Sequence, residues 1–447
     1  MVKYKRKVGG FMKKIIIKNL GPVKNVELNL DKQFNVFIGE QASGKSTIAK
    51  AVYLFTDIEE SWRSMLLSIF FKRTKQMNNM DVYLLFHDAM ERSFFSMFGL
   101  SNVDKDTILR FEFSQKENNY MEINFTEDKD FKLRISRNIR ANINNILDEF
   151  WETLDLVGDK KLPSSIMDKF YDDLAGVFGE SKNTLYIPAA RSFINMLDES
   201  LIEFIEKMTV DYSIRGFVEE VLSYKRLVNQ GVFDKFVSLN KEFDHNNFRK
   251  EYDVITNYKK HILKGEYKIY EERECLEIGK EIKVPLRSAS SGQQEAVWIL
   301  NLLTLSFITG NHSAFIIEEP EAHLYPNAQL DLVKYIVMIA KLTGSRVLIT
   351  THSPYVLNAM NLLAYSGIVE GDDDDSVNHD KSIVEERYRV PKGELLTYQL
   401  KDGYAQSIMD EELLIKSERI DGVTEIMNDL FNKIIDKAID KSGELNE

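Results

Sequence analysis

A glycine-rich run near the start of the chain has the residue types that hold the phosphate tail of a nucleotide. A mostly apolar stretch, 34–38, leads into Gly39-Glu40-Gln41-Ala42-Ser43-Gly44-Lys45-Ser46, and a helix is predicted from Thr47. The two glycines let the backbone curl closely around an anion, while the helix N-terminus offers N–H groups and a positive dipole end. We therefore predict that Lys45 reaches the β- and γ-phosphates and that Ser46 ligates Mg²⁺.

Two later strands end in side chains that could complete such a site. The apolar run 313–317 leads into Glu318-Glu319, and the run 346–349 leads to His352. We expect the acids at the carboxyl edge of a sheet, with the phosphate loop on the neighbouring strand. One acid could then hold Mg²⁺ and the next could polarise water. His352 could donate to a phosphate oxygen, although a lone histidine after a strand is more often structural.

A third polar segment, Ser290-Ser291-Gly292-Gln293, precedes a helix predicted at 296–305. Small hydroxyl groups and a glycine at a helix N-terminus can bind an anion. The same residues also form ordinary helix caps, so this segment alone is a weak indication.

Composition limits the class of protein. The chain has 447 residues, enough for two to three domain-sized units, and a formal net charge of −12, which argues against a protein that coats nucleic acid. The single cysteine, Cys275, excludes an intrachain disulfide and suits the cytoplasm, and no signal peptide is visible. The longest apolar stretch, 296–308, is too short to span a bilayer and predicts a core helix, so we expect no membrane partner.

Hydrophobic periodicity predicts an α/β protein. Strands at 13–18 and 23–30 and the strand before Gly39 predict the edge of a mixed sheet that feeds the nucleotide site. Helical and strand patterns then alternate, which divides the chain into 1–55 (phosphate loop), 56–105 (helical insertion), 106–190 (antiparallel β-subdomain, a short helical stretch and a return strand), 191–285 (helical insertion and strands), 286–360 (the other motifs) and 361–447 (C-terminal extension).

The C-terminal extension combines short strands with one helix. Residues 389–410 have strand patterning, and 421–439 predict an amphipathic helix that docks on its own head or on a partner. The acidic run after Val369 is interpreted as a solvated loop.

Taken in order, the phosphate loop, Ser290 to Gln293, Glu318-Glu319 and His352 resemble the ABC-type ATPase heads of the SMC/RecF/OLD-like branch. The run from Glu318 to Pro326, together with Thr351-His352-Ser353-Pro354, is similar to OLD-type ATPases and their stand-alone relatives. This resemblance implies an α/β head with a mixed, largely parallel sheet, an antiparallel β-subdomain and large helical insertions.

The resemblance also implies roles by position. Glu318 would bind Mg²⁺ where the family usually has Asp, Glu319 would be the catalytic glutamate and His352 the switch histidine. Glu321 to Leu324 would match the loop that couples two sites, and Arg191 is either near the junction with the helical lobe or a structural arginine. The ATP-binding residues implied are Gly39, Glu40, Gln41, Ala42, Ser43, Gly44, Lys45, Ser46, Thr47, Ser290, Gly292 and Gln293, the last three acting on ATP held by a second subunit.

The function implied is an ATP-hydrolysing head that dimerises around two ATP–Mg²⁺ and switches a separate effector, a nuclease or toxin in anti-phage defence. Val369-Glu370-Gly371 superficially matches the opening of a Toprim nuclease module, but no later Asp-x-Asp completes its metal site. The alternative is a DNA-binding repair or maintenance ATPase of RecF/SMC type, with nucleic acid as the partner. A scaffold that does not hydrolyse ATP is disfavoured by Glu319 and His352.

Overall fold

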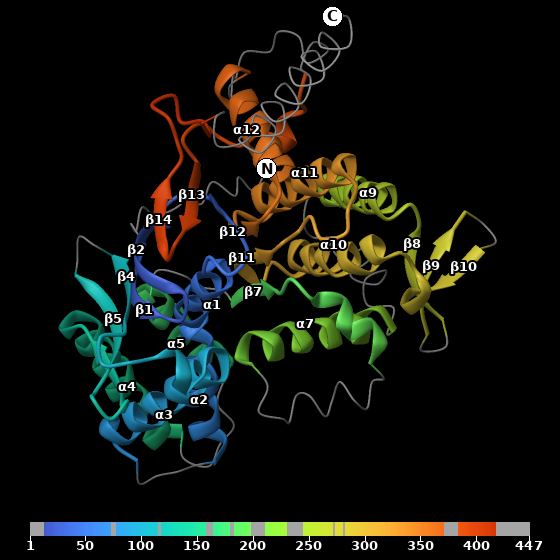
Figure 1. The fold of residues 1–447 in the computed structure, drawn as a ribbon. Helices are drawn as coiled ribbons and strands as arrows, with labels where there is room; N and C mark the ends of the chain where they lie inside the picture. The colour runs from blue at the N-terminus through green and yellow to red at the C-terminus, as the bar shows by residue number, and fades with distance from the viewer. Residues whose placement is uncertain are drawn as a thin grey trace, which may run out of the picture.

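The computed structural model describes residues 13–72, 77–114, 118–157, 164–178, 183–197, 211–229, 245–270, 273–279, 282–370 and 383–416 (Figure 1). Within these residues the fold is a large mixed sheet with helices packed on both faces, and a small sheet to one side. The predicted α/β class is confirmed.

The large sheet has eleven strands in the order β6-β5-β4-β1-β2-β14-β13-β3-β12-β11-β7. The strands are β1 (Lys14–Leu20), β2 (Val23–Asn29), β3 (Phe34–Gly39), β4 (Ile108–Ser114), β5 (Asn119–Phe125), β6 (Phe131–Ile135), β7 (Asn183–Ile187), β11 (His312–Glu318), β12 (Arg346–Thr351), β13 (Leu395–Lys401) and β14 (Tyr404–Ser407). The small sheet, in the order β10-β9-β8, contains β8 (Glu266–Tyr270), β9 (Arg273–Ile278) and β10 (Ile282–Pro285).

The half of the large sheet that contains β3 is parallel. The strands β13, β3, β12, β11 and β7 pair in parallel with one another, whereas β6, β5, β4, β1 and β2 form an antiparallel series. Between the two series, β14 pairs antiparallel with β13 and parallel with β2. In β11, Phe315 and Ile317 enter one hydrophobic core and Ile316 enters the other. Both faces are therefore buried, which explains why these strands are continuous apolar runs instead of alternating ones.

Two expectations about strand neighbours are wrong. The strand that leads into the phosphate loop, β3, is not at an edge with β1 and β2, because the hairpin of β13 and β14 lies between β2 and β3. The acidic strand β11 is not the direct neighbour of β3 either, because β12 lies between them. The predicted antiparallel strands β4, β5 and β6 exist, and they continue the same sheet through β1.

Helices cover the two faces of the sheet. The face whose core contains Ile316 carries α1 (Lys45–Thr56), α2 (Ile58–Lys72), α3 (Asn79–Phe98), α4 (Arg137–Val157) and α5 (Ser164–Phe178). The other face carries α7 (Tyr212–Asn229), α9 (His245–Leu263), α10 (Ser291–Thr309), α11 (Pro326–Thr343) and α12 (Pro354–Val369). Figure 1 shows α2 to α5 gathered near β4 and β5, with α9 and α10 reaching toward the small sheet and α11 beside α12.

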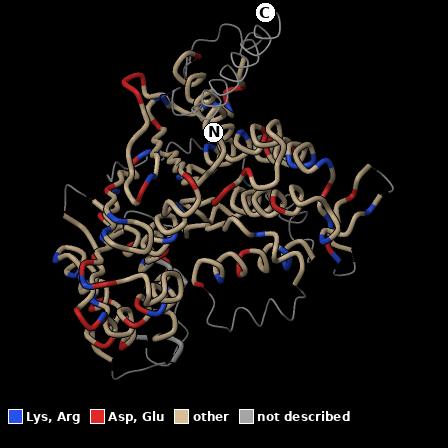
Figure 2. The backbone as a smooth tube through the Cα atoms, viewed as in Figure 1, with Lys and Arg blue, Asp and Glu red and all other residues tan. Residues whose placement is uncertain are grey.

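The predicted core helix at 296–308 is confirmed as part of α10, which is buried along most of its length. Among the described residues, no helix is long and apolar enough to cross a bilayer. Strand patterning at 389–410 is confirmed in β13 and β14, whereas the helix predicted at 421–439 lies outside the described residues. Figure 2 shows basic and acidic residues interspersed over most of the chain.

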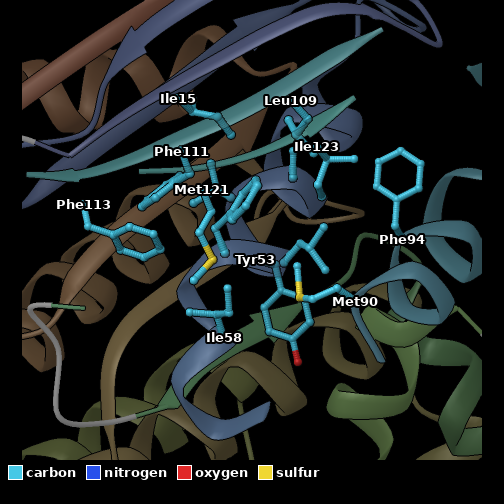
Figure 3. Close-up of a cluster of buried hydrophobic side chains, with 14 of the residues drawn as sticks. Ile15, Tyr53, Ile58, Met90, Phe94, Leu109, Phe111, Phe113, Met121 and Ile123 are labelled. Carbon is cyan, nitrogen blue, oxygen red and sulfur yellow. The ribbon is translucent and has the colours of Figure 1, made fainter. Parts of the chain in front are cut away.

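An aromatic cluster joins α1 to the antiparallel strands (Figure 3). Phe111 of β4 is fully buried, and its ring stacks on Phe55 of α1 with a centroid distance of 5.4 Å. Phe113 on the same strand lies 5.0 Å from Phe111, measured between ring centroids. Because α1 starts at the phosphate loop, this cluster fixes the helix that carries Lys45 at its first position.

We predict that Phe111→Ala lowers the free energy of unfolding by about 3–5 kcal/mol, because it removes a buried ring and leaves a cavity. Guanidinium denaturation followed by circular dichroism measures this change. Leu156→Ala is the matched control, since Leu156 is 87 % exposed and its loss should change stability by less than about 0.5 kcal/mol. Equal effects of the two substitutions would contradict the placement of Phe111 in the core.

Candidate nucleotide site

The phosphate loop is held between two strands that flank it. A Cβ atom added to Gly39 would lie 2.4 Å from the carbonyl oxygen of Leu400 in β13. At Gly44, where φ is +98°, a Cβ would lie 2.6 Å from Cγ2 of Val23 in β2. Both positions therefore exclude a side chain, and the loop adopts a conformation that glycine tolerates. The approach of Leu400 to Gly39 was not predicted, because it depends on the inserted hairpin of β13 and β14.

Lys45, the first residue of α1, lies with its side chain along the loop. Its Nζ donates to the carbonyl oxygens of Gly39 and Glu40, each at 2.8 Å, and lies 3.4 Å from Nδ1 of His352. Burial lowers the pKa of Lys45, and the carboxylates of Glu319, Glu321 and Glu318 oppose that shift. The ammonium group is thus surrounded by hydrogen-bond acceptors, and it lies near the carboxylates that follow β11.

The two acids that end β11 have different surroundings. Glu318 is 4 % exposed, its Oε2 accepts from the backbone N–H of Ala189 at 3.4 Å, and its Oε1 has no hydrogen-bond partner among the described residues. Glu319 leaves the strand with φ of +43°, and its backbone N–H donates to the carbonyl oxygen of Thr350 at 2.8 Å. The turn directs the second carboxylate away from the buried position of the first, and the Glu319 side chain is 34 % exposed.

His352 bridges the loop lysine and the second acid. Its Nε2 lies 3.2 Å from Oε1 of Glu319, while Nδ1 faces Nζ of Lys45. The two contacts fit a neutral imidazole with its proton on Nε2, because the ammonium group can only donate and the carboxylate can only accept. The structure therefore brings together Lys45, Glu319 and His352, which are far apart in the sequence.

Glu321 holds the backbone that carries His352. Its Oε1 accepts from the hydroxyl of Thr351 and from the backbone N–H of His352, both at 2.7 Å. The motif resemblance implies for Glu321 only a loop that couples two sites, and this contact is not predictable from it. Its position two residues after Glu319 was visible in the sequence, but no local pattern identifies the strand whose end it contacts.

Arg191 holds the acidic turn from the other side. The side chain is fully buried, and its guanidinium donates to the carbonyl oxygens of Glu318 at 2.8 Å, Glu319 at 3.0 Å and Glu295 at 2.9 Å. An ion pair with the Glu295 carboxylate, at 3.3 Å, compensates part of the buried charge. These contacts agree with the structural alternative for Arg191, since it fixes backbone and is enclosed by protein.

The segment from Ser290 to Gln293 is an N-terminal capping box. Ser290 is the N-cap of α10, and the side chains and backbones of Ser290 and Gln293 bond reciprocally. Gly292 is buried, and a Cβ there would lie 2.7 Å from the carbonyl oxygen of His323. Ser290 and Ser291 remain exposed. Among the described contacts, none joins this segment to Lys45, Glu319 or His352 of the same chain.

A pocket lies beside the start of α1. It is lined by the turn between β1 and β2, by Ser46, Thr47 and Lys50, and by the C-terminal end of α3. The predicted metal ligand Ser46 and the predicted contact residue Thr47 therefore face a hollow next to the phosphate loop.

Comparison with known proteins decides the family. A sequence profile described as AAA ATPase domain matches residues 11–357, well over half of the chain. The chain belongs to the AAA ATPase domain family. This ATPase matches no curated protein in sequence.

Several solved structures are similar to this ATPase in fold. One is an SMC head bound to the C-terminal winged-helix domain of ScpA, with 10 % sequence identity and a TM-score of 0.42; the match covers 89 % of this chain and 97 % of that chain. Another is the SMC head domain with an extended coiled coil bound to the C-terminal domain of ScpA, from Pyrococcus furiosus, with 11 % identity and a TM-score of 0.39; the match covers 94 % of this chain and 99 % of that chain. A third is the recombination mediator protein RecF with bound nucleotide, with 13 % identity and a TM-score of 0.37; the match covers 89 % of this chain and 98 % of that chain.

We predict that Glu321→Ala lowers kcat for ATP hydrolysis at least about tenfold, because His352 loses the anchor of its backbone. The KM for ATP should change less than about twofold, since Glu321 does not bond to the phosphate loop. Steady-state phosphate release measures both constants.

Glu321→Gln is the matched control, because its amide oxygen can accept the same two bonds and most of the activity should remain. A kcat of Glu321→Gln as low as that of Glu321→Ala would show that the charge matters and the anchor does not.

Proposed function

We propose that this ATPase binds ATP–Mg²⁺ at the loop 39–47 and hydrolyses it with Glu319 and His352, within a dimer whose second copy supplies Ser290, Gly292 and Gln293. The observation that carries the proposal is the chain of contacts from Lys45 through His352 to Glu319. These contacts join an ammonium group, an imidazole and a carboxylate at one sheet edge, which supports roles in phosphate binding and hydrolysis.

The residues present fit a magnesium nucleotide. The loop 39–44 leads directly into the N-terminus of α1, which favours an anion, and buried Glu318 has an oxygen without a partner among the described residues. Carboxylate and hydroxyl oxygens are ligands that Mg²⁺ accepts, so Glu318 and Ser46 would hold the metal. The bound metal would neutralise charge on the phosphate oxygens.

Each protein residue then has a distinct task. Lys45 would exchange its contacts with the Gly39 and Glu40 carbonyls for phosphate oxygens. Glu319 would accept the proton of an attacking water, which its partly exposed carboxylate can reach, and His352 would keep that carboxylate oriented. Arg191 and Glu321 would act only as positioning residues, because they bond the backbone of the catalytic turn and of the switch loop.

A second copy is proposed because the capping segment lies apart from the site of its own chain. Ser290 and Ser291 are exposed at the N-terminus of α10, whose positive dipole end favours an anion. The side chains of Glu319 and His352 are each about one-third exposed, so water reaches them in one chain. Closing a second copy over the site would exclude that water and add the missing donors.

We further propose that closure of the dimer acts on a separate effector protein, a nuclease or toxin in bacterial anti-phage defence. The support is the similarity of the run Glu318 to Pro326 to stand-alone OLD-type heads. This half of the proposal rests on analogy of motifs, and it is tested by capture of the effector from the source cells with the ATP-locked variant described next.

We predict that Glu319→Gln lowers ATP turnover at least about 100-fold while ATP still binds, because the amide cannot accept the proton from water. Phosphate release and equilibrium binding of a fluorescent ATP analogue measure the two properties. Glu412→Gln, an exposed substitution far along the chain, is the control and should keep full activity. Wild-type turnover in Glu319→Gln would overturn the assigned base.

We predict that ATP–Mg²⁺ converts Glu319→Gln from monomer to dimer, because bound nucleotide can then no longer be hydrolysed. Light scattering during gel filtration measures the mass. Adding Ser290→Arg should abolish this dimer without weakening ATP binding, whereas Ser407→Arg, at another exposed serine, should not. A monomer at saturating ATP–Mg²⁺ would refute the shared site and leave the ATPase assignment intact.

A further inference from the structure

The helix α12 has an apolar outer face. Its sequence, Pro354–Val369, contains no charged residue, although the helix lies at the surface. Tyr355, Leu362, Tyr365 and Val369 are 54, 46, 53 and 62 % exposed, respectively. We call these four residues the α12 stripe. Their spacing of seven, three and four residues places all of them on one side of the helix.

The α12 stripe is not explained by the fold of the described residues. The opposite side of α12 packs Val356, Leu357, Met360 and Leu363 into the core, so the helix is already anchored. Exposed Asn358 lies between Tyr355 and Leu362 on the same side, so the contiguous apolar part of the stripe is Leu362, Tyr365 and Val369. Single exposed apolar residues are ordinary on a protein surface, but adjacent ones on a helix without charges mark a contact surface.

The chain itself returns to this surface. The backbone N–H of Ile415 donates to the side-chain oxygen of Asn361 on α12 at 2.8 Å, and Met409 bridges to Ile415. Asn361 and Tyr365 are four residues apart, and so they are neighbours on the helix surface. Lys416, the last described residue, directly follows Ile415, which contacts α12. The sequence continues from there to Glu447.

The remaining sequence carries an apolar pattern of matching length. Val423, Ile426, Met427, Leu430 and Ile434 recur at helical spacing between acidic and basic residues. As a helix, that pattern would extend over about 17 Å, and the α12 stripe extends over about 21 Å. Being joined to the same chain, this segment has a high effective concentration at the stripe, which favours it over a separate partner.

We propose that residues 417–447 dock through this apolar face on the α12 stripe of their own chain. The docked segment covers the four exposed side chains and places its charged residues toward solvent. The proposal does not depend on the nucleotide chemistry.

Paired cysteines test the contact in the full-length chain. Cys275, the only cysteine, is replaced by Ser, and Leu362→Cys is combined with Leu430→Cys. Mild oxidation at low protein concentration should give an intramolecular disulfide, seen as a mobility shift without a dimer band. Leu156→Cys with Leu430→Cys is the matched control and should give none, because exposed Leu156 lies on α4 away from α12.

A second arm separates the other occupants of the stripe. Tyr365→Asp should reduce the yield of the disulfide at least about tenfold, while thermal unfolding of the described fold stays unchanged. A disulfide that links only two chains would show that a second copy occupies the stripe and would overturn the proposal. Equal or absent cross-linking in the Leu362 and Leu156 pairs would also overturn it.

Discussion

The contacts of one lysine ammonium set the geometry on which the remaining site depends. Nζ of Lys45 needs acceptors because it is removed from bulk water, and it finds them in two backbone carbonyls and in the imidazole of His352. The acidic residues Glu318, Glu319 and Glu321 offset the cost of burying this charge. The positive group thereby fixes the end of β12 relative to the start of α1, two segments that are about 300 residues apart.

Backbone contacts maintain this arrangement more than side-chain contacts do. Arg191 donates to the carbonyl oxygens of Glu318 and Glu319, and the carboxylate of Glu321 accepts from the backbone N–H of His352. Removal of either partner would leave buried polar groups unpaired, which is costly in a low-dielectric interior. The side chains of Glu319 and His352 thus project from two rigid turns, and their own exposure does not make their positions loose.

Local features of this ATPase could be predicted from sequence, and long-range ones could not. The loop 39–46, the capping box at Ser290 and the core helix α10 depend on residue types within one or two turns, so their patterns are sufficient. The order of strands depends on which distant segments pair. Nothing near Gly39 indicates that Leu400 lies against it, and nothing near Glu321 indicates the end of β12. For the same reason the segments of β13 and β14 were predicted as strands, but the pairing of β13 with the strand that leads into the phosphate loop was not predicted.

The position of that hairpin has a consequence for how the chain folds. β3 is synthesised long before its two neighbours in the sheet, β12 (Arg346–Thr351) and β13 (Leu395–Lys401). The entropy of closing such long loops is lost before the strand pairs form and stabilise the sheet, and this makes folding slow. During synthesis the unpaired edges of β3 are a template for wrong partners. The sheet around the phosphate loop is consequently complete only after β12 and β13 have been synthesised.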